Sequence, residues 1–128
     1  MSKSVVRTDS APAPFQGAPY SQGIVFGDLV FVSGQLGIDP EEGHVVGGGI
    51  VEQTDRVMKN LAAILEEADS SLGNVLTVSI FLVDLGDFQA MNEVYASHLS
   101  EPYPARATVQ IAALPSGARV EIAVVAHR

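Results

Sequence analysis

The sequence predicts a single α+β domain in which one mixed β-sheet carries two helices packed on one face. Three observations lead to this prediction: a tight hairpin signal near the start, two amphipathic helical stretches, and a β-branched apolar stretch between the helices. The length of 128 residues is usual for one domain and allows one hydrophobic core. We therefore treat residues 1–128 as one domain.

The first two strands are predicted on either side of Gly27-Asp28. Apolar residues at 24–26 and 29–32 flank this dipeptide, and a two-residue Gly-X loop is typical of a tight hairpin. The preceding stretch, 11–19, contains too many prolines for a helix or a central strand. We expect it to form an extended, ordered loop.

Two helices are predicted from apolar residues that recur at helical spacing. Those of the first are Ile50, Val57, Leu61, Ile64, Leu65 and Ala68. Those of the second are Phe88, Met91, Tyr95 and Leu99, with Asp84 or Asp87 as the cap and an end before Pro102. The glycine-rich stretch 43–49 lacks the Lys-Ser or Lys-Thr of a P-loop, so we interpret it as a flexible connector.

Three further strands complete the predicted sheet, at 75–83, 105–112 and 119–126. Nearly every residue of 75–83 is apolar or β-branched, which is typical of a central strand covered on both faces. Alternation places Arg106, Thr108 and Gln110 on one face of their strand, and we expect Ala107, Val109 and Ile111 to face the core. In the last strand Glu121 lies on the face opposite to Val120, Ile122 and Val124.

The composition disfavours several classes of function. The absence of Cys excludes disulfides, thiolate metal sites and a cysteine nucleophile. Seven basic and fifteen acidic residues give a net charge of -8, which repels nucleic acid. Neither a signal peptide nor a membrane-spanning stretch is present, so we expect a cytoplasmic protein. A composition that is 47% hydrophobic and 17% charged indicates apolar surface that contacts another subunit.

Charged and polar residues on the last strands leave two interpretations open. Arg106 and Glu121 could form a cross-strand ion pair on a solvated face, which would add little stability. Alternatively, the guanidinium could bind a substrate carboxylate while Glu121 orients or deprotonates water. The spacing does not distinguish the two. His44, His98 and His127 show no metal-ligand spacing, and we expect them at the surface with no metal site.

Nine short motifs, spread over nearly the whole chain, together form a specific signal. They are Pro19-Tyr-Ser-Gln22, Val32-Ser-Gly-Gln35, Gln53-Thr54, Asp84-Leu-Gly-Asp-Phe88, Asn92, Tyr95, Pro104-Ala-Arg106, Ala113-Leu-Pro115 and Val120-Glu-Ile122. In this order and spacing they resemble the YjgF/RidA family. The resemblance implies a chorismate-mutase-like fold and a homotrimer with a barrel-like centre and active sites at subunit interfaces.

The resemblance also implies an activity: hydrolysis of reactive 2-enamine and 2-imine acids, such as 2-aminoacrylate, 2-iminopropanoate and 2-iminobutanoate, to 2-oxo acids and ammonia. No metal or organic cofactor takes part. By the same resemblance Arg106 binds the substrate carboxylate and Glu121 orients or activates water. The Ser33 side chain and the Gly34 N–H fix the substrate, and Tyr20 and Asn92 complete the wall.

Two departures from the family pattern bear on the substrate. Many relatives carry Cys where this chain has Thr108, whose hydroxyl or backbone N–H could serve instead. The proline-rich opening is longer than usual for the family, and the segment between Leu99 and Pro104 is shorter than in some bacterial members. Two other functions remain as alternatives: non-catalytic binding of a small carboxylate ligand, and the ribonuclease or translation-inhibitor role described for some relatives.

Overall fold

Six strands form one mixed sheet in the computed structural model, which describes residues 2–128. The sheet order is β1-β2-β3-β6-β4-β5. The strands are β1 (Ser4–Val6), β2 (Gly23–Phe26), β3 (Leu29–Leu36), β4 (Val75–Leu82), β5 (Ala105–Gln110) and β6 (Val120–His127). β4 and β5 are parallel, and all other neighbouring strands are antiparallel.

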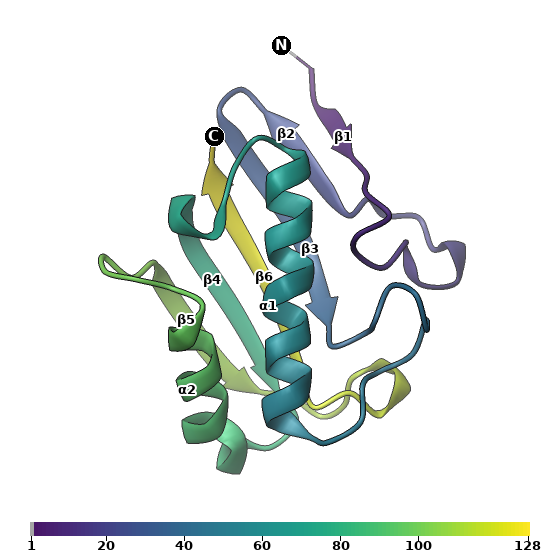
Figure 1. Cartoon of the computed structure of the whole chain (residues 1–128), viewed down its shortest axis with the longest axis vertical. Coiled ribbons are helices and arrows are strands. Elements are labelled where there is room, and N and C mark those ends of the chain that lie inside the picture. Colours follow the sequence, from purple (N-terminus) through teal and green to yellow (C-terminus); the bar gives the residue numbers. More distant parts are fainter. Residues whose placement is uncertain (1) are drawn as a thin grey trace.

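Two helices, α1 (Ile50–Glu67) and α2 (Phe88–Ser97), lie on the same face of the sheet (Figure 1). The predicted α+β class, the single mixed sheet and the hairpin between β2 and β3 are confirmed. The structure adds β1, a strand of three residues that pairs with β2. Three residues are too few to show a period-2 pattern, which explains why the sequence did not predict this strand.

The hydrophobic core lies between α1 and the sheet. The apolar stripe of α1, which includes Val57, Leu61 and Ile64, is fully buried. The sheet contributes the side chains that alternate toward the helices, such as Ile80 and Ile122. The repeat of apolar residues along α1 therefore packs as the sequence predicts.

The opposite face of the sheet is not covered within the chain. β4 lies between β6 and β5 as predicted, but its expected burial on both faces is wrong, because Leu76 remains 47% exposed. Both helices lie on one face, so nothing in residues 2–128 covers the other (Figure 1). We call this uncovered surface the open face. Its apolar residues are Ile24, Phe26, Leu29, Phe31, Phe81, Ala107, Val109 and Val125.

The orientation of β5 corrects the sequence prediction. Arg106 pairs with Val78 and Thr108 with Ile80, and both partners are buried beneath the helices. Val109, predicted to face the core, lies on the open face and is 47% exposed. Alternation shows which residues share a face, but it does not show which face the chain itself covers. Ala107, also predicted to face the core, lies on the open face for the same reason. Ile111 lies one residue beyond the end of β5.

Gln22 organises the proline-rich loop that precedes β2. Its side chain is buried, and its Nε2 donates hydrogen bonds to the carbonyls of Thr8, Ala11 and Pro12 at 3.0, 3.1 and 2.8 Å. Its Oε1 accepts from the Thr8 N–H at 2.7 Å. One side chain thus satisfies four backbone groups. The loop is ordered as predicted and includes a 3-10 turn at Phe15–Gly17.

The two helices are linked by polar contacts at their outer surfaces. The His98 ring contacts the Asp55 carboxylate at 2.8 Å, and Lys59 contacts the other oxygen of that carboxylate at 3.0 Å. The side chain of His98, expected at the surface, is partly buried by this contact and 20% exposed. Asp87 does not cap α2 through its side chain but forms an ion pair with Arg119. These contacts fix α2 relative to α1 and β6.

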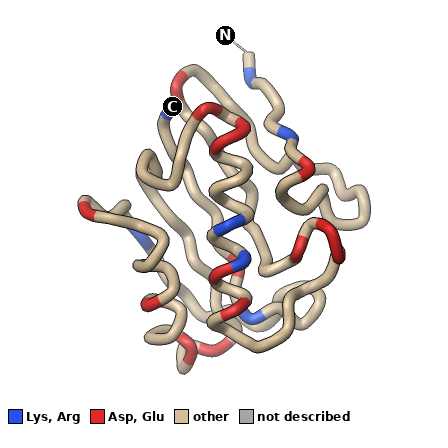
Figure 2. The backbone as a smooth tube through the Cα atoms, in the orientation of Figure 1, with Lys and Arg blue, Asp and Glu red and all other residues tan. Residues whose placement is uncertain are grey.

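Acidic residues outnumber basic ones, and the basic residues form no cluster among residues 2–128. Figure 2 shows acidic positions spread over helices and loops, whereas the few basic positions are scattered. Within residues 2–128 no helix is both long and apolar enough to cross a membrane. The same residues contain no group of three or more His, Cys, Asp or Glu side chains arranged to hold a metal ion.

We predict that Gln22→Ala lowers the free energy of unfolding by about 2–3 kcal/mol, because buried backbone groups of the loop lose their partners. Urea denaturation measures the change. Gln89→Ala, at an exposed glutamine of α2, is the matched control and should change stability by less than about 0.5 kcal/mol. Equal effects of the two substitutions would contradict the role assigned to Gln22.

Candidate functional site

The predicted site residues other than Thr108 lie in two separate pockets. The first, here called the Glu121 pocket, has a volume of about 420 Å³ and contains Tyr20, Ser33, Gly34 and Glu121. The second, the Arg106 pocket, has a volume of about 340 Å³ and contains Asn92 and Arg106. The two pockets share no lining residue. Each therefore holds about half of the predicted site.

A bulge in β3 shapes the floor of the Glu121 pocket. Val32 pairs with Val124 and Gln35 with Ile122, so two residues of β3, Ser33 and Gly34, lie opposite one residue of β6. Such a bulge bends the strand and redirects its side chains, and bulges are frequent beside active sites. It places the Ser33 side chain and the Gly34 backbone at the same pocket as Glu121.

Glu121 approaches Gly34 so closely that a Cβ at position 34 would displace the carboxyl group from its present position. A Cβ on Gly34 would lie 2.6 Å from Glu121 Oε2, which is shorter than any real contact of that kind. The Glu121 side chain has no ion-pair partner among residues 2–128. Burial raises the pKa of its carboxyl group above the ordinary value, because desolvation penalises the charged form. A carboxyl group with a raised pKa is a better proton acceptor when it is ionised.

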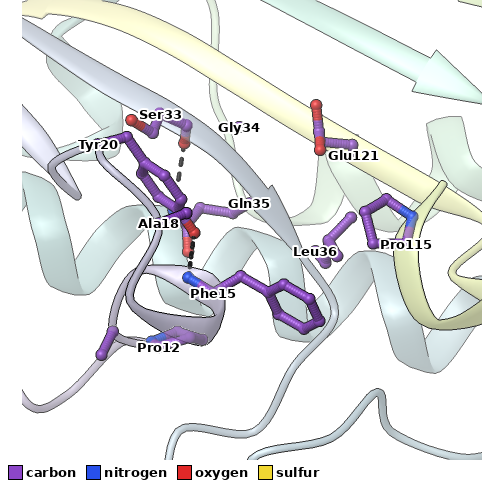
Figure 3. Close-up of a pocket in the computed structure, with 11 residues that line it drawn as sticks. Pro12, Phe15, Ala18, Tyr20, Ser33, Gly34, Gln35, Leu36, Pro115 and Glu121 are labelled. Atoms are coloured by element: carbon purple, nitrogen blue, oxygen red, sulfur yellow. Dashed lines mark hydrogen bonds between the residues drawn. The ribbon is translucent and has the colours of Figure 1, made fainter.

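Two hydroxyl groups on the other side of the pocket are already engaged, and Figure 3 shows the hydrogen bond that Tyr20 accepts from Phe15. Ser33 Oγ donates its proton to the Ser21 carbonyl at 2.6 Å, so toward a ligand it can only accept. Tyr20 Oη accepts from the Phe15 N–H at 2.6 Å and retains its own proton for donation. The side chains of Tyr20, Ser33 and Glu121 thus offer a ligand one donor, one acceptor and one carboxylate.

Arg106 is held in a defined position at the edge of the sheet. Its Nη1 donates to Asn92 Oδ1 at 2.6 Å, and its guanidinium lies 5.5 Å from the Phe88 ring centre and 5.1 Å from that of Tyr95. These cation–π contacts orient the group without neutralising its charge. The bond to Asn92 leaves further N–H groups, which can bind a carboxylate in the bidentate manner.

The hydroxyl of Thr108 lies away from both pockets. Its Oγ1 is buried and has no hydrogen-bond partner in the part of the chain that the structure describes, as is true of the Tyr95 hydroxyl. Thr108 is not a lining residue of the Arg106 pocket. The structure therefore brings Asn92 to Arg106 but does not bring the Thr108 hydroxyl there.

Arg106 and Glu121 lie on opposite faces of the sheet. Arg106 pairs with Val78, which is buried under the helices, whereas Glu121 pairs with Phe81 of the open face. β4 separates their strands. The cross-strand ion pair considered from the sequence is consequently not formed within this chain.

Comparison with known proteins decides the family. The family model described as Endoribonuclease L-PSP matches residues 8–128. A RutC family protein of Pyrococcus abyssi is 47% identical over 128 residues, covering 100% of this chain and 99% of that protein. The chain belongs to the YjgF/RidA family. The resemblance recognised from the nine motifs is thereby confirmed.

Other members of the YjgF/RidA family match over nearly their whole length. A mouse protein named 2-iminobutanoate/2-iminopropanoate deaminase is 41% identical over 124 residues, covering 97% of this chain and 90% of that protein. The crystal structure of RidA from the Antarctic bacterium Psychrobacter sp. has a TM-score of 0.93 at 45% identity, covering 98% of this chain and 99% of that one. The fold seen here is thus the family fold.

Several residues that line the two pockets or contact Arg106 were given no role in the site by the sequence analysis. Phe88 and Tyr95 were assigned to the core stripe of α2, although both contact Arg106. Phe15 and Leu36 line the Glu121 pocket. Phe15 had a recognisable signal, because it is the one large apolar residue in a loop of small residues and prolines. Leu36 had none, since its role depends on the bulge.

We predict that Gly34→Ala moves the Glu121 carboxyl group toward solvent and lowers its pKa toward the ordinary value of 4.5, because the added methyl group occupies its place. A ¹³C carboxyl titration by NMR measures this pKa. Gly47→Ala is the matched control, since a Cβ there has no neighbour within 4 Å. An unchanged pKa in Gly34→Ala would show that the contact does not control Glu121.

Proposed function

We propose that the protein hydrolyses reactive 2-enamine and 2-imine carboxylic acids, such as 2-aminoacrylate, 2-iminopropanoate and 2-iminobutanoate, to 2-oxo acids and ammonia. One observation carries the proposal: the half-buried Glu121 carboxyl group, with its raised pKa and no counter-ion, faces a pocket of ligand size. Membership of a family with named deaminases of this class supports it. No step of the proposed reaction uses a metal or an organic cofactor.

The proposed active form is a homotrimer with sites at the subunit interfaces. A site of this kind needs Arg106 and Glu121 together, and one chain holds them on opposite faces. Arg106 lies on β5, the last strand of the sheet, where a neighbouring subunit can approach it. The open face is an apolar surface that such a neighbour would cover. Association would thus bring the two pockets together.

Substrate binding follows from the groups of the two pockets. The guanidinium of Arg106, oriented by Asn92, would bind the substrate carboxylate with two parallel hydrogen bonds. Ser33 Oγ would accept a hydrogen bond from the substrate N–H, and the Tyr20 hydroxyl and the Gly34 N–H would donate to its polar atoms. The imine carbon then lies beside Glu121. Thr108 remains a candidate through its backbone N–H.

The reaction requires one acid–base group. An enamine first tautomerises to the imine, and Glu121 takes a proton from water as the water oxygen bonds to the imine carbon. The electron pair of the C=N bond moves to nitrogen, which takes up the proton that Glu121 holds. Glu121 then takes the hydroxyl proton of the tetrahedral aminoalcohol and passes it to nitrogen, as the C=O bond forms and the C–N bond breaks to release ammonia. One positioned acid–base group contributes roughly 10²–10⁴-fold, which suffices because such imines also hydrolyse unaided.

Ribonuclease activity is favoured less, although the family description names it. RNA binding needs a basic surface or exposed stacking aromatics. The net charge is -8, and the basic positions are scattered (Figure 2). Non-catalytic binding of a small carboxylate remains the other alternative, and Glu121 distinguishes it from hydrolysis, because simple binding has no use for a half-buried base.

We predict that the protein accelerates 2-oxobutanoate release from threonine supplied to a dehydratase, in competition with semicarbazide, which traps the imine. Arg106→Ala should abolish the acceleration, and Glu121→Gln should reduce it by about 10²-fold or more. Arg7→Ala, at an exposed arginine beside β1, is the matched control and should retain activity.

The mass in solution should remain that of a trimer in all variants, because Arg106 and Glu121 contribute mainly to the site. Full activity of both variants would contradict their roles. A wild-type protein that accelerates none of several enamine substrates would contradict deamination itself, and binding of 2-oxo acids would then be tested by calorimetry.

A further inference from the structure

We propose that Phe15 determines the substrate preference of the site, and that the Glu121 pocket selects enamine and imine acids with a bulky apolar side chain, such as those derived from leucine, over those derived from alanine. This inference rests on the proposed function and deepens it. It concerns the proline-rich loop and the apolar side of the pocket, which the deamination chemistry does not use.

The Glu121 pocket is divided into a polar side and an apolar side. Tyr20 and Ser33 lie on one side, and Phe15, Leu36 and Pro115 on the other, with the Phe15 ring projecting from the loop toward this second group (Figure 3). Phe15 is 38% exposed although it belongs to the most apolar residue types. An aromatic ring directed into a solvent-filled pocket gains free energy only when something apolar covers it.

The position of Phe15 is fixed by its surroundings. Its N–H donates to the Tyr20 hydroxyl at 2.6 Å, and its carbonyl accepts from the Ala18 N–H at 3.0 Å. The next residue, Gln16, has a φ of 54°, which a non-glycine residue keeps only where neighbouring contacts hold it. Gln22 anchors the start of the same loop by donating a hydrogen bond to the Pro12 carbonyl. The ring is therefore placed before a ligand arrives, which reduces the entropic cost of binding.

The available space exceeds the needs of a small substrate. The pocket volume is about 420 Å³, whereas a water molecule in the liquid takes up about 30 Å³. The side chain of an alanine-derived imine is one methyl group, which offers little apolar surface to the wall formed by Phe15 and Leu36. A leucine-derived imine carries an isobutyl group at that carbon and can cover the Phe15 ring.

Specificity then follows from the order of groups along the pocket. In the proposed complex the carboxylate binds Arg106 of a neighbouring subunit, the imine carbon lies at Glu121, and the remaining substituent extends toward Phe15 and Leu36, which line the same pocket as Glu121. Each methylene that fits a hydrophobic pocket changes kcat/KM by roughly 10-fold or more. Because this contact lies beyond the reacting atoms, it affects selectivity more than the chemical step itself.

The test compares imines generated in place from leucine and from alanine by an amino-acid oxidase, with semicarbazide as the trapping agent. We expect wild-type protein to show a kcat/KM for the leucine-derived imine at least about 10-fold above that for the alanine-derived imine. Phe15→Ala should lose about 10-fold on the leucine-derived imine and less than about 3-fold on the alanine-derived one. Phe15→Leu should give a smaller loss of the same kind.

Two further variants separate positioning from general damage. Tyr20→Phe removes the hydroxyl that holds the Phe15 N–H and should lower the leucine-to-alanine ratio through the loop. Val51→Ala, at a 48% exposed position on α1 outside both pockets, should leave the ratio unchanged. Thermal unfolding of each variant shows whether the substitution destabilises the protein. If Phe15→Ala is destabilised, the leucine-to-alanine ratio of kcat/KM is compared between wild type and Phe15→Leu instead.

Several results would overturn the inference. If Phe15→Ala and Phe15→Leu each lost the same factor in kcat/KM on both imines, Phe15 would have a structural role only. A wild-type preference for the alanine-derived imine would show that the apolar wall does not select. If the protein acts on the alanine-derived imine and its kcat/KM is no higher for the leucine-derived imine, only this inference is contradicted. If it acts on no imine, the proposed function is contradicted as well.

Discussion

One-sided packing is the constraint on which the rest of the structure depends. Both helices cover the same face of the sheet, so each strand has one face in the core and one on the surface. Because side chains alternate along a strand, Arg106 points to the helix side and Glu121 to the open face. A single chain therefore keeps the proposed carboxylate-binding group and the proposed base apart. A second subunit is the simplest way to bring them together.

Local irregularities, rather than regular elements, build the Glu121 pocket. The bulge at Ser33 and Gly34 brings the backbone close to Glu121, and the absence of a Cβ on Gly34 leaves room for the carboxyl group in this position. The proline-rich loop is held by hydrogen bonds from a buried Gln22. Tyr20 then connects this loop to the polar side of the pocket. These features position functional groups without contributing much to the core.

The sequence predicted the elements well, because periodicity reports directly on α1 and on the strands. It failed on the face of the sheet that the helices do not cover: Val109 was placed in the core because it is apolar, yet it lies on the open face. For the site, family motifs identified Arg106 and Glu121, but only coordinates show that they lie in different pockets. Phe15 was missed, since loop conformation is not encoded in a periodic pattern.

The central claim is that each active site combines Arg106 of one subunit with Glu121 of another. Co-expression of Arg106→Ala and Glu121→Gln chains tests it, with deamination measured on the purified mixture. If sites lie between subunits of a trimer, every mixed trimer holds one intact site, and random mixing restores about a quarter of wild-type activity. Each variant alone stays inactive. A mixture as inactive as its components, despite proven mixed trimers, would contradict the account.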